Sequence, residues 1–336
     1  MIMKSNPSTR LISAMDERKI IEKNMTIPVE VVEYALERFN ANDVYMPDKI
    51  SHVFDEETQN RVNCMPGALL SEQLYGVKWV AVFPNNPKDG YRNVTGTTIL
   101  TEIQHGHTLA IMDSGYLTDI RTAAVGATAA KYLSRANVET IGFIGAGQQA
   151  RRHLDLIKVI RPSIKKCYVS SKTLQTVNEF IEEESSKHPD VEFVRCGNDF
   201  RAATIDADII VTATSTQSDL LKADWIKKGA LYIHVAGWED EYAVAQKATK
   251  IVCDDWECIK HRTQTISRMY KEGLLNDNDI YGNLVDIVNG TKAARENDEE
   301  FIYFCSVGLA YIDVAFAKYV YEQCTEQGLG TCFAFN

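Results

Sequence analysis

A short glycine-rich turn at residues 145–150 has the residue types and the spacing of a phosphate-binding site. Gly145 and Gly147 follow an apolar run, and Ala150 occupies the place of a third small residue. Gly145 permits the sharp turn, Gly147 lets the backbone approach a pyrophosphate, and the small Ala150 lets the next helix pack closely on the strand. The N–H groups at the start of that helix then face the phosphates. With a helical pattern at 151–160 after it, the turn predicts a dinucleotide-binding βαβ unit.

Two basic side chains interrupt otherwise apolar segments. Lys78 lies within the apolar run 76–83, and Arg121 begins a helical segment that is otherwise small and apolar. A buried cation needs an anionic partner, and a guanidinium grips a carboxylate through two parallel hydrogen bonds. Both residues therefore predict the binding of a substrate carboxylate. The alternatives are a lysine that extends from an edge strand to solvent, and a surface ion pair between Arg121 and Asp119.

The residues that end the second strand of the βαβ unit bear on the choice of cofactor. An NAD site of this kind places a carboxylate about 20 residues after the glycines, on the ribose 2′-hydroxyl. Here the strand at 166–170 ends in Ser170, and Ser171 and Lys172 follow it. Two hydroxyls and a lysine suit a 2′-phosphate better, so we expect NADP(H) rather than NAD(H). The alternative role of the two serines is to cap the next helix.

Hydroxyl-bearing residues also end a later apolar run, at 207–213. Thr212, Ala213 and Thr214 stand at the expected end of that strand. Because the carboxyl ends of parallel strands line the ligand crevice in such sheets, we expect these residues to contact the cofactor. Turn formation is the alternative role of the threonines.

Two kinds of pattern position these residues along the chain. The central part alternates helical patterns with strands that we expect at 139–144, 166–170, 191–195, 207–213, 230–235 and 250–253. Such alternation is typical of a parallel sheet with helices on both faces. The front part is α+β in character, with a helix expected at 26–40 and strands at 76–83, 97–102 and 108–113. A helix at 119–134 leads into the central part, and the last part is expected to hold a strand at 301–306 and a helix at 310–323. Thr118 is the expected N-cap of the helix at 119–134, and His105 and His107 are expected in a solvated hairpin turn.

Composition and charge exclude several classes of protein. The 336 residues carry a formal net charge of −10 and a pI near 5.3, whereas a nucleic-acid-binding protein presents a basic surface. No apolar run reaches the roughly 18 residues that cross a bilayer. The eight cysteines are scattered without a Cys-x-x-Cys pair, which indicates reduced thiols in a cytoplasmic protein and no metal site. We therefore expect neither a nucleic-acid partner nor a membrane partner.

Several short segments combine into one pattern along the chain. They are Met65-Pro66, Gly76-Val77-Lys78-Trp79-Val80, Asn85-Asn86-Pro87, Leu117-Thr118-Asp119-Ile120-Arg121-Thr122-Ala123-Ala124, the turn at Gly145, and Ser306-Val307-Gly308-Leu309-Ala310 with Asp313. This pattern resembles the ornithine cyclodeaminase/μ-crystallin family from about residue 45 to about residue 330. The resemblance implies an α/β fold in which a Rossmann NAD(P)-binding domain, at 121–304, is inserted between two parts of another domain. That other domain, at 1–120 and 305–336, is an α+β domain that binds substrate and forms a homodimer.

The resemblance also implies NAD(P)-linked chemistry at a C–N bond. The small-molecule partner is then an amino acid or a secondary amine, or, in the opposite direction, a keto acid together with an amine. We expect an opine-like dehydrogenase or imine reductase, most similar to the N-(2-amino-2-carboxyethyl)-L-glutamate dehydrogenase of 2,3-diaminopropionate biosynthesis. The alternatives are an ornithine cyclodeaminase, which converts L-ornithine to L-proline and ammonia, and an alanine-type amino-acid dehydrogenase. A further alternative is a non-catalytic NADPH- and ligand-binding protein like μ-crystallin.

The family pattern implies further substrate-binding residues. In the family, the residues that match Lys78 and Arg121 bind the substrate carboxylate. We expect Lys78 to be a catalytic residue as well. Lys49 takes the place of a family arginine, with charge but without the guanidinium fork, and Arg61 is a second candidate guanidinium. Asn63 stands where cyclodeaminases have a glutamate, which disfavours cyclisation of ornithine.

The family pattern also implies an acid/base just past the strand at 230–235. Glu239 or Asp240 takes that place, and a solvated acidic loop is the alternative. A carboxylate there can move the proton of an amine and activate water. The residues that we expect to bind the cofactor are Thr122, Gly145, Ala146, Gly147, Gln148, Gln149, Ser170, Ser171, Lys172, Thr212, Ala213, Thr214, Ser306, Val307 and Gly308.

Overall fold

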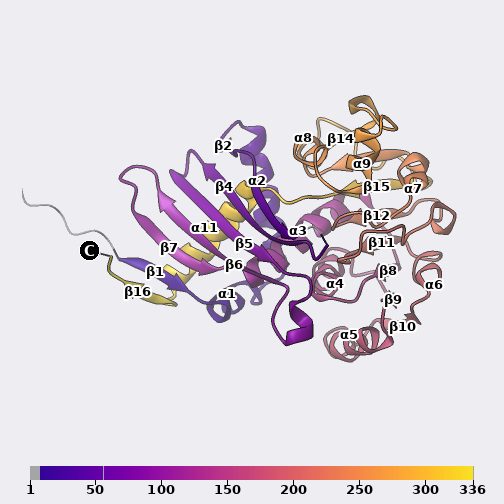
Figure 1. Cartoon of the computed structure of the whole chain (residues 1–336), viewed down its shortest axis with the longest axis horizontal. Helices are drawn as coiled ribbons and strands as arrows, with labels where there is room; N and C mark the ends of the chain where they lie inside the picture. The colour runs from indigo at the N-terminus through magenta and orange to yellow at the C-terminus, as the bar shows by residue number, and fades with distance from the viewer. Residues whose placement is uncertain (1–7, 56, 336) are drawn as a thin grey trace, which may run out of the picture. The chain divides into compact units, whose positions relative to one another are not determined.

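The computed structural model describes residues 8–55 and 57–335 of the chain (Figure 1). These residues form two compact units, and the boundary between the units falls within helix α3 (Gly115–Leu133). The first unit holds the described residues up to Arg121 and those from Leu309 onward, and the second holds the residues between them. Each unit has its own sheet.

The sheet of the first unit is mainly antiparallel, in the order β16-β1-β7-β6-β5-β4-β2, with β3 also paired to β4. Its strands are β1 (Thr9–Ile12), β2 (Val44–Tyr45), β3 (Ile50–Asp55), β4 (Asn60–Leu69), β5 (Leu74–Val82), β6 (Val94–Glu102), β7 (Thr108–Asp113) and β16 (Thr331–Phe333). The helices of the unit besides α3 are α1 (Ala14–Ile21), α2 (Ile27–Asn40) and α11 (Ala310–Glu326), with a short 3₁₀ turn at Asn86–Asp89.

Helix α11 covers one face of this sheet because two glycines leave room for it. A Cβ at Gly67 of β4 would lie 3.0 Å from the backbone carbon of Ala310, and one at Gly76 of β5 would lie 2.9 Å from Val314. The close approach brings the polar residue of this helix face, Asp313, against the middle of the sheet. In Figure 1 the helix runs across the strands of the unit.

The sheet of the second unit is parallel throughout, in the order β10-β9-β8-β11-β12-β15-β13-β14. Its strands are β8 (Thr140–Ile144), β9 (Lys166–Ser170), β10 (Glu192–Gly197), β11 (Ile209–Thr212), β12 (Leu231–His234), β13 (Lys250–Cys253), β14 (Gly282–Asn283) and β15 (Ile302–Cys305). The helices between them are α4 (Gln148–Ile160), α5 (Leu174–Lys187), α6 (Phe200–Thr204), α7 (Tyr242–Lys247), α8 (Trp256–Ile259), α9 (Thr265–Lys271) and α10 (Leu284–Val288), with 3₁₀ turns at Ala223–Trp225 and Asp277–Asp279. The predicted Rossmann sheet is confirmed, because the strands from β10 to β12 have the 3-2-1-4-5 order of that fold.

The start of α3 differs from the prediction. The helix begins at Gly115, four residues before the predicted start, and Thr118 lies inside it rather than at its N-cap. Asp113 caps it instead, because its Oδ1 accepts the N–H groups of Gly115 and Tyr116 at 2.8 and 3.2 Å. The hairpin turn at 105–107 is as predicted. No helix among residues 8–55 and 57–335 is long and apolar enough to cross a membrane.

Glu17 of α1 is a buried carboxyl group. It has 0% exposure, and neither of its oxygens has a hydrogen-bond partner among the described residues. Burial, and then the charge of Asp113, raise its pKa to about 10 from an ordinary 4.5. Between these values the group is neutral in the folded protein and ionised in the unfolded protein. The free energy of unfolding therefore falls as the pH rises from 4.5 toward 10.

We expect Glu17→Gln, which mimics the protonated acid, to match the wild type in stability at pH 4 and to exceed it at pH 8. The expected gain at pH 8 is at most about 5 kcal/mol, from about 1.4 kcal/mol for each pH unit between 4.5 and 8. Urea unfolding at the two pH values measures it, with Glu37→Gln on the exposed side of α2 as the control. An equal effect of Glu17→Gln at both pH values would contradict the neutral, buried state of Glu17.

Candidate functional site

A buried ionic cluster in the first unit joins Lys78 of β5, Arg121 of α3 and Asp313 of α11. Nζ of Lys78 lies 2.6 Å from Oδ1 of Asp313, and Nε of Arg121 lies 2.9 Å from the same oxygen. The Lys78, Arg121 and Asp313 side chains are 2%, 9% and 5% exposed. Two cations share one carboxylate, so the cluster carries an excess of positive charge where water is scarce.

The excess charge shows in the pKa of Lys78. Burial, and then the charge of Arg121, lower that pKa to about 7 from an ordinary 10.5, while Asp313 acts in the opposite direction. Among the described residues, Oδ2 of Asp313 has no hydrogen-bond partner, and Nε is the one guanidinium nitrogen of Arg121 that has one. The cluster can therefore bind a second carboxylate through the Nη atoms of Arg121, and it can release a proton from Lys78 near neutral pH.

The structure argues against the two alternative roles of these cations, and the binding of a substrate carboxylate stays a prediction. β5 pairs with β4 on one side and β6 on the other, so Lys78 does not extend from an edge strand. Asp119 pairs with Arg92 at 2.9 Å, so it is not the partner of Arg121. Sequence reasoning placed Asp313 in the family pattern but gave it no role in the site, and the available signal was the one carboxylate within the apolar segment 310–317.

The other predicted substrate-binding residues lie in the same unit. Lys49 is half-buried, and its charge contributes to the lowered pKa of Lys78. Arg61 of β4 donates from Nη1 to the carbonyl of Gln59 at 3.0 Å. Strand alternation puts Arg61 on the face that carries Lys78, because Lys78 pairs with Met65 four residues along β4. The structure shows no contact of Arg61 with the ionic cluster among the described residues.

The glycine turn of the second unit has the form of a phosphate-binding loop. Gly145 has φ +101°, and a Cβ there would lie 2.6 Å from the carbonyl oxygen of Ala213. Gly147 is the N-cap of α4, and a Cβ there would have no neighbour within 4 Å. The N–H groups of the first turn of α4, which begins at Gln148, have no partner within the helix. Beside the open space at Gly147, they fit the phosphates of a dinucleotide.

The residues that end β9 do not behave as a pair of free hydroxyls. Ser170 is buried, and its hydroxyl donates to the carbonyl of Phe143 at 2.8 Å. Ser171 is half-buried and Lys172 is exposed. Thr173 is the N-cap of α5, so the alternative cap by Ser170 or Ser171 is wrong.

Both predicted acid/base residues are fully buried in the second unit. Oε2 of Glu239 accepts the Thr212 hydroxyl at 2.9 Å and the Ala236 N–H at 3.3 Å, and Oε1 accepts the Thr214 N–H. Burial raises the pKa of Glu239 to about 7.

Asp240 is likewise enclosed by polar side chains. It accepts the hydroxyl of Thr265 at 2.6 Å and those of Tyr232 and Tyr303 at 3.3 Å. Burial raises the pKa of Asp240 to about 7 as well. The alternative of a solvated acidic loop is therefore wrong for these two residues, and the acid/base role stays a prediction to which their burial gives no support.

The remaining predicted cofactor-binding residues lie on loops and on α3. Oδ2 of the buried Asp254 accepts the N–H groups of Val307 and Gly308, each at 2.8 Å. Ser306 donates its N–H to the carbonyl of His234 at 3.2 Å. Thr122 is half-buried on α3.

Comparison with known proteins gives consistent matches over nearly the whole chain. The sequence profile of the ornithine cyclodeaminase/mu-crystallin family matches residues 13–328. A Delta(1)-pyrroline-2-carboxylate reductase of Bacillus cereus is 35% identical, with 97% of this chain and 99% of that protein covered. An N-((2S)-2-amino-2-carboxyethyl)-L-glutamate dehydrogenase of Staphylococcus aureus is 26% identical, over 90% of this chain and 91% of that protein.

Solved structures share the fold. The Delta(1)-pyrroline-2-carboxylate reductase of Thermococcus litoralis, in complex with NADH and L-proline, is 31% identical with a TM-score of 0.91, over 96% of this chain and 99% of that one. An archaeal alanine dehydrogenase, a dimer with bound NAD, is 28% identical with a TM-score of 0.88, over 98% of this chain and all of that one.

These structures correct the expected cofactor. NADP(H) was the expectation, and it is wrong, because the two solved relatives hold NADH and NAD. The physical reason lies at the end of β9, where the Ser170 hydroxyl is already bonded to Phe143. Ser171 can bond a ribose hydroxyl as well as a phosphate, and the residues after it up to Phe180 include no arginine for a 2′-phosphate.

Proposed function

Because the chain belongs to the ornithine cyclodeaminase/mu-crystallin family, we propose that it is an NAD-dependent oxidoreductase that reduces the C=N bond of a small imino acid. The proposed pair is Δ1-pyrroline-2-carboxylate and L-proline. The ionic cluster of Lys78, Arg121 and Asp313 carries the proposal, because its excess positive charge fits one substrate carboxylate. The names of the Bacillus cereus and Thermococcus litoralis relatives support the substrate.

Each member of the ionic cluster has a role in the proposed reaction. Bound NADH supplies the hydride that adds to the imine carbon. Arg121 holds the substrate carboxylate through its Nη atoms, and Lys78 gives the imine nitrogen the proton that completes the amine. Asp313 fixes Nζ of Lys78 at 2.6 Å and Nε of Arg121 at 2.9 Å, so that both donors keep their positions.

A second candidate is an opine-like dehydrogenase with a larger substrate that bears more than one carboxylate. Lys49 favours it, because it places a third cation near Lys78. The Staphylococcus aureus relative has such a substrate by name. Ornithine cyclisation is disfavoured by Asn63, whose side-chain oxygen accepts the Ser51 hydroxyl at 2.7 Å.

A nicotinamide absorbance assay tests the proposed function. Purified protein is mixed with NADH or NADPH and with Δ1-pyrroline-2-carboxylate, or with 2-keto acids paired with amines or amino acids, and the products are identified by mass spectrometry. We expect NADH oxidation with formation of proline, and a preference for NADH over NADPH. Activity only with pairs that give dicarboxylic secondary amines would select the opine-like candidate, and proline from ornithine without net NADH change would select the cyclodeaminase.

We propose further that the protein is a homodimer that pairs through the uncovered face of the first sheet. Apolar residues lie in register across four neighbouring strands of this face: Leu11, Ile111, Ile99 and Val77. Trp79, two residues after Val77 on the same face, is 56% exposed. An apolar surface of this kind is typical of an interface, and the archaeal alanine dehydrogenase is a dimer.

We expect Trp79→Glu to convert the dimer to a single chain of 37.8 kDa, because it would bury a charge in the interface. Light scattering on a size-exclusion column measures the mass. Tyr91→Glu is the matched control, since Tyr91 is 71% exposed outside the strands of this face. A Trp79→Glu variant that keeps the mass of the wild type would rule out this interface.

A further inference from the structure

Three predicted cofactor-binding segments of the second unit are each held by a charged side chain that is itself buried. Arg151 of α4 donates to the carbonyl of Ala146 in the glycine turn. Glu239 accepts from the loop after β11, and Asp254 accepts from Val307 and Gly308 after β15. Arg151, Glu239 and Asp254 are 6%, 0% and 2% exposed.

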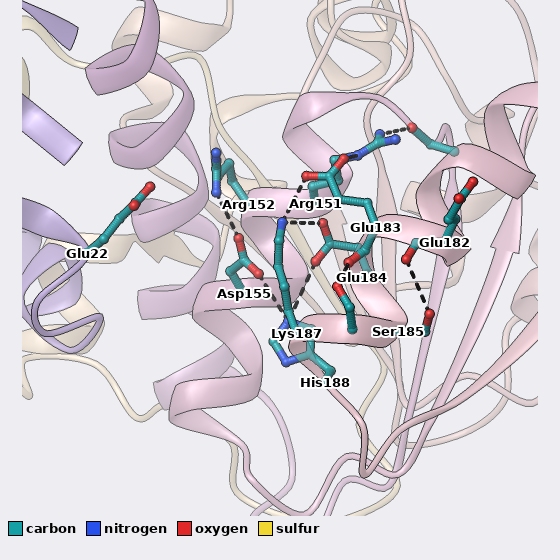
Figure 2. A network of polar contacts seen from close by, with 12 residues as sticks. Glu22, Arg151, Arg152, Asp155, Glu182, Glu183, Glu184, Ser185, Lys187 and His188 are labelled. Atoms are coloured by element: carbon teal, nitrogen blue, oxygen red, sulfur yellow. Dashed lines mark hydrogen bonds and ion pairs between the residues drawn. The ribbon is translucent and has the colours of Figure 1, made fainter. Parts of the chain in front are cut away.

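Arg151 shows how far such support extends. Its Nε also donates to Glu183 of α5 at 2.8 Å, and Glu183 in turn pairs with Lys187 at 2.9 Å. Figure 2 shows these side chains between α4 and α5, with Arg152, Asp155 and His188 continuing the network. Through Arg151, the glycine turn is thus connected to α5. The loop after β11 and the segment after β15 are each held by one carboxylate, that of Glu239 and that of Asp254.

Glu239 is the anchor that joins two loops. Thr212 and Thr214 belong to the end of β11 and its loop, whereas Ala236 belongs to the loop after β12. β11 and β12 are neighbouring parallel strands in which Thr212 pairs with His234. Both loops therefore leave the sheet at its carboxyl edge, where ligands of such sheets bind. Backbone bonds such as Ser218 N–H to the Trp238 carbonyl join the loops farther from the strands, and the Glu239 carboxylate is the side chain that links the two loops next to their strands.

The surroundings of Glu239 leave no place for a reacting group. Both carboxylate oxygens already accept protein donors, and the residue has no exposed surface. Its Oε2 lies 3.7 Å from Nε2 of His234, which has no exposed surface either. A general acid or base must come within hydrogen-bond reach of the substrate, and a carboxylate enclosed in this way does not.

We infer that Glu239 is a positioning residue for NADH, which joins the loops after β11 and β12 in the shape that accepts the cofactor, rather than the acid/base of the reaction. The inference rests on the proposed use of NAD. The Glu239 carboxylate then contributes to cofactor affinity. Loss of this carboxylate raises the Kd of NADH and leaves the rate of the bound complex nearly unchanged. The proton chemistry stays with Lys78.

The test is the Glu239→Gln variant, measured by NADH fluorescence and by steady-state kinetics. The amide cannot accept at both positions, so we expect the Kd of NADH to rise about tenfold or more, with kcat at saturating NADH within about threefold of the wild type. A loss of kcat of about 100-fold or more with unchanged Kd is the signature of an acid/base and would overturn the inference.

Two further variants guard against a general loss of structure. Thr212→Val removes one of the three donors and is expected to raise the Kd of NADH in the same direction but by less. Glu241→Gln is the matched control, because Glu241 is two residues away, stands at the N-cap of α7, and accepts from Ala223 rather than from any of the three donors to Glu239. We expect it to bind NADH like the wild type. If Glu239→Gln does not fold, an unchanged Kd in Thr212→Val would overturn the inference.

Hydrogen exchange separates this inference from the proposed function. In Glu239→Gln without cofactor, the amides of Thr214 and Ala236 are expected to exchange faster than in the wild type, while those of the β8 strand do not change. Wild-type protein that binds NADH but reduces no imino acid would end the proposed function and leave this inference standing. Unchanged exchange at Thr214 and Ala236 would overturn the inference whatever the activity.

Discussion

Replacement of Lys78 by methionine is expected to lower kcat for imine reduction about 1,000-fold, within the range of about 100- to 10,000-fold for the loss of a general acid. The methionine keeps the length of the side chain but has no proton to give. Arg121 remains to neutralise Asp313 at 2.9 Å, so the buried carboxylate keeps a partner. Stopped assays of NADH oxidation at saturating substrate measure the change.

The pH dependence of the wild type gives a second readout of Lys78. An acid must be protonated to act, and the pKa of Lys78 is lowered to about 7 by burial and by Arg121. The rate of reduction is therefore expected to fall as the pH rises through about 7, and the rate of the reverse oxidation to rise.

The control for Lys78→Met is NADH affinity. The Kd of NADH is expected to stay that of the wild type, because the glycine turn belongs to the other unit. A Lys78→Met variant that retains kcat within about threefold would remove the assigned role.

Replacement of Arg121 by leucine is expected to raise the KM of the imino acid about 10- to 140-fold. A charge-assisted hydrogen bond contributes about 1.5–3 kcal/mol, and every 1.4 kcal/mol is about tenfold. The effect falls on substrate affinity because the Nη atoms of Arg121 hold the carboxylate. Steady-state kinetics with NADH saturating, together with proline binding, measure it.

Two matched variants sharpen the result for Arg121. Arg121→Lys keeps the charge without the fork, so it is expected to recover only part of the affinity. Arg92→Leu removes a half-exposed arginine that pairs with Asp119, and surface pairs contribute only about 0–1 kcal/mol. Equal KM values in Arg121→Leu and Arg92→Leu would show that the carboxylate binds elsewhere.

Local patterns were enough to predict the fold of the second unit. Apolar runs separated by helical patterns indicate buried parallel strands, and those around 141, 210 and 232 are the three central ones. The glycine spacing of 145–150 was equally informative, because the backbone at Gly145 admits no side chain. The two basic residues in apolar segments, Lys78 and Arg121, were found because a buried charge is costly.

Features that depend on distant contacts could not be predicted in this way. Asp313 meets Lys78 across 235 positions of sequence, and no local pattern indicates that pair. Three acidic residues at 239–241 are typical of a solvated loop. Two of them, Glu239 and Asp240, are instead buried, where they accept hydrogen bonds from Thr212 and Thr265. The NADP(H) expectation failed for the same reason, since Ser170 is bonded to a neighbouring strand.

The most direct test of the account follows the hydride itself. The protein is supplied with NADH deuterated at the transferable C4 position and with Δ1-pyrroline-2-carboxylate, and the product is analysed by mass spectrometry and NMR. Proline with one deuterium at Cα is expected for each NADH consumed. Proline without deuterium at Cα, or no NADH consumption with any imino acid offered, would contradict the claim that this chain reduces a C=N bond.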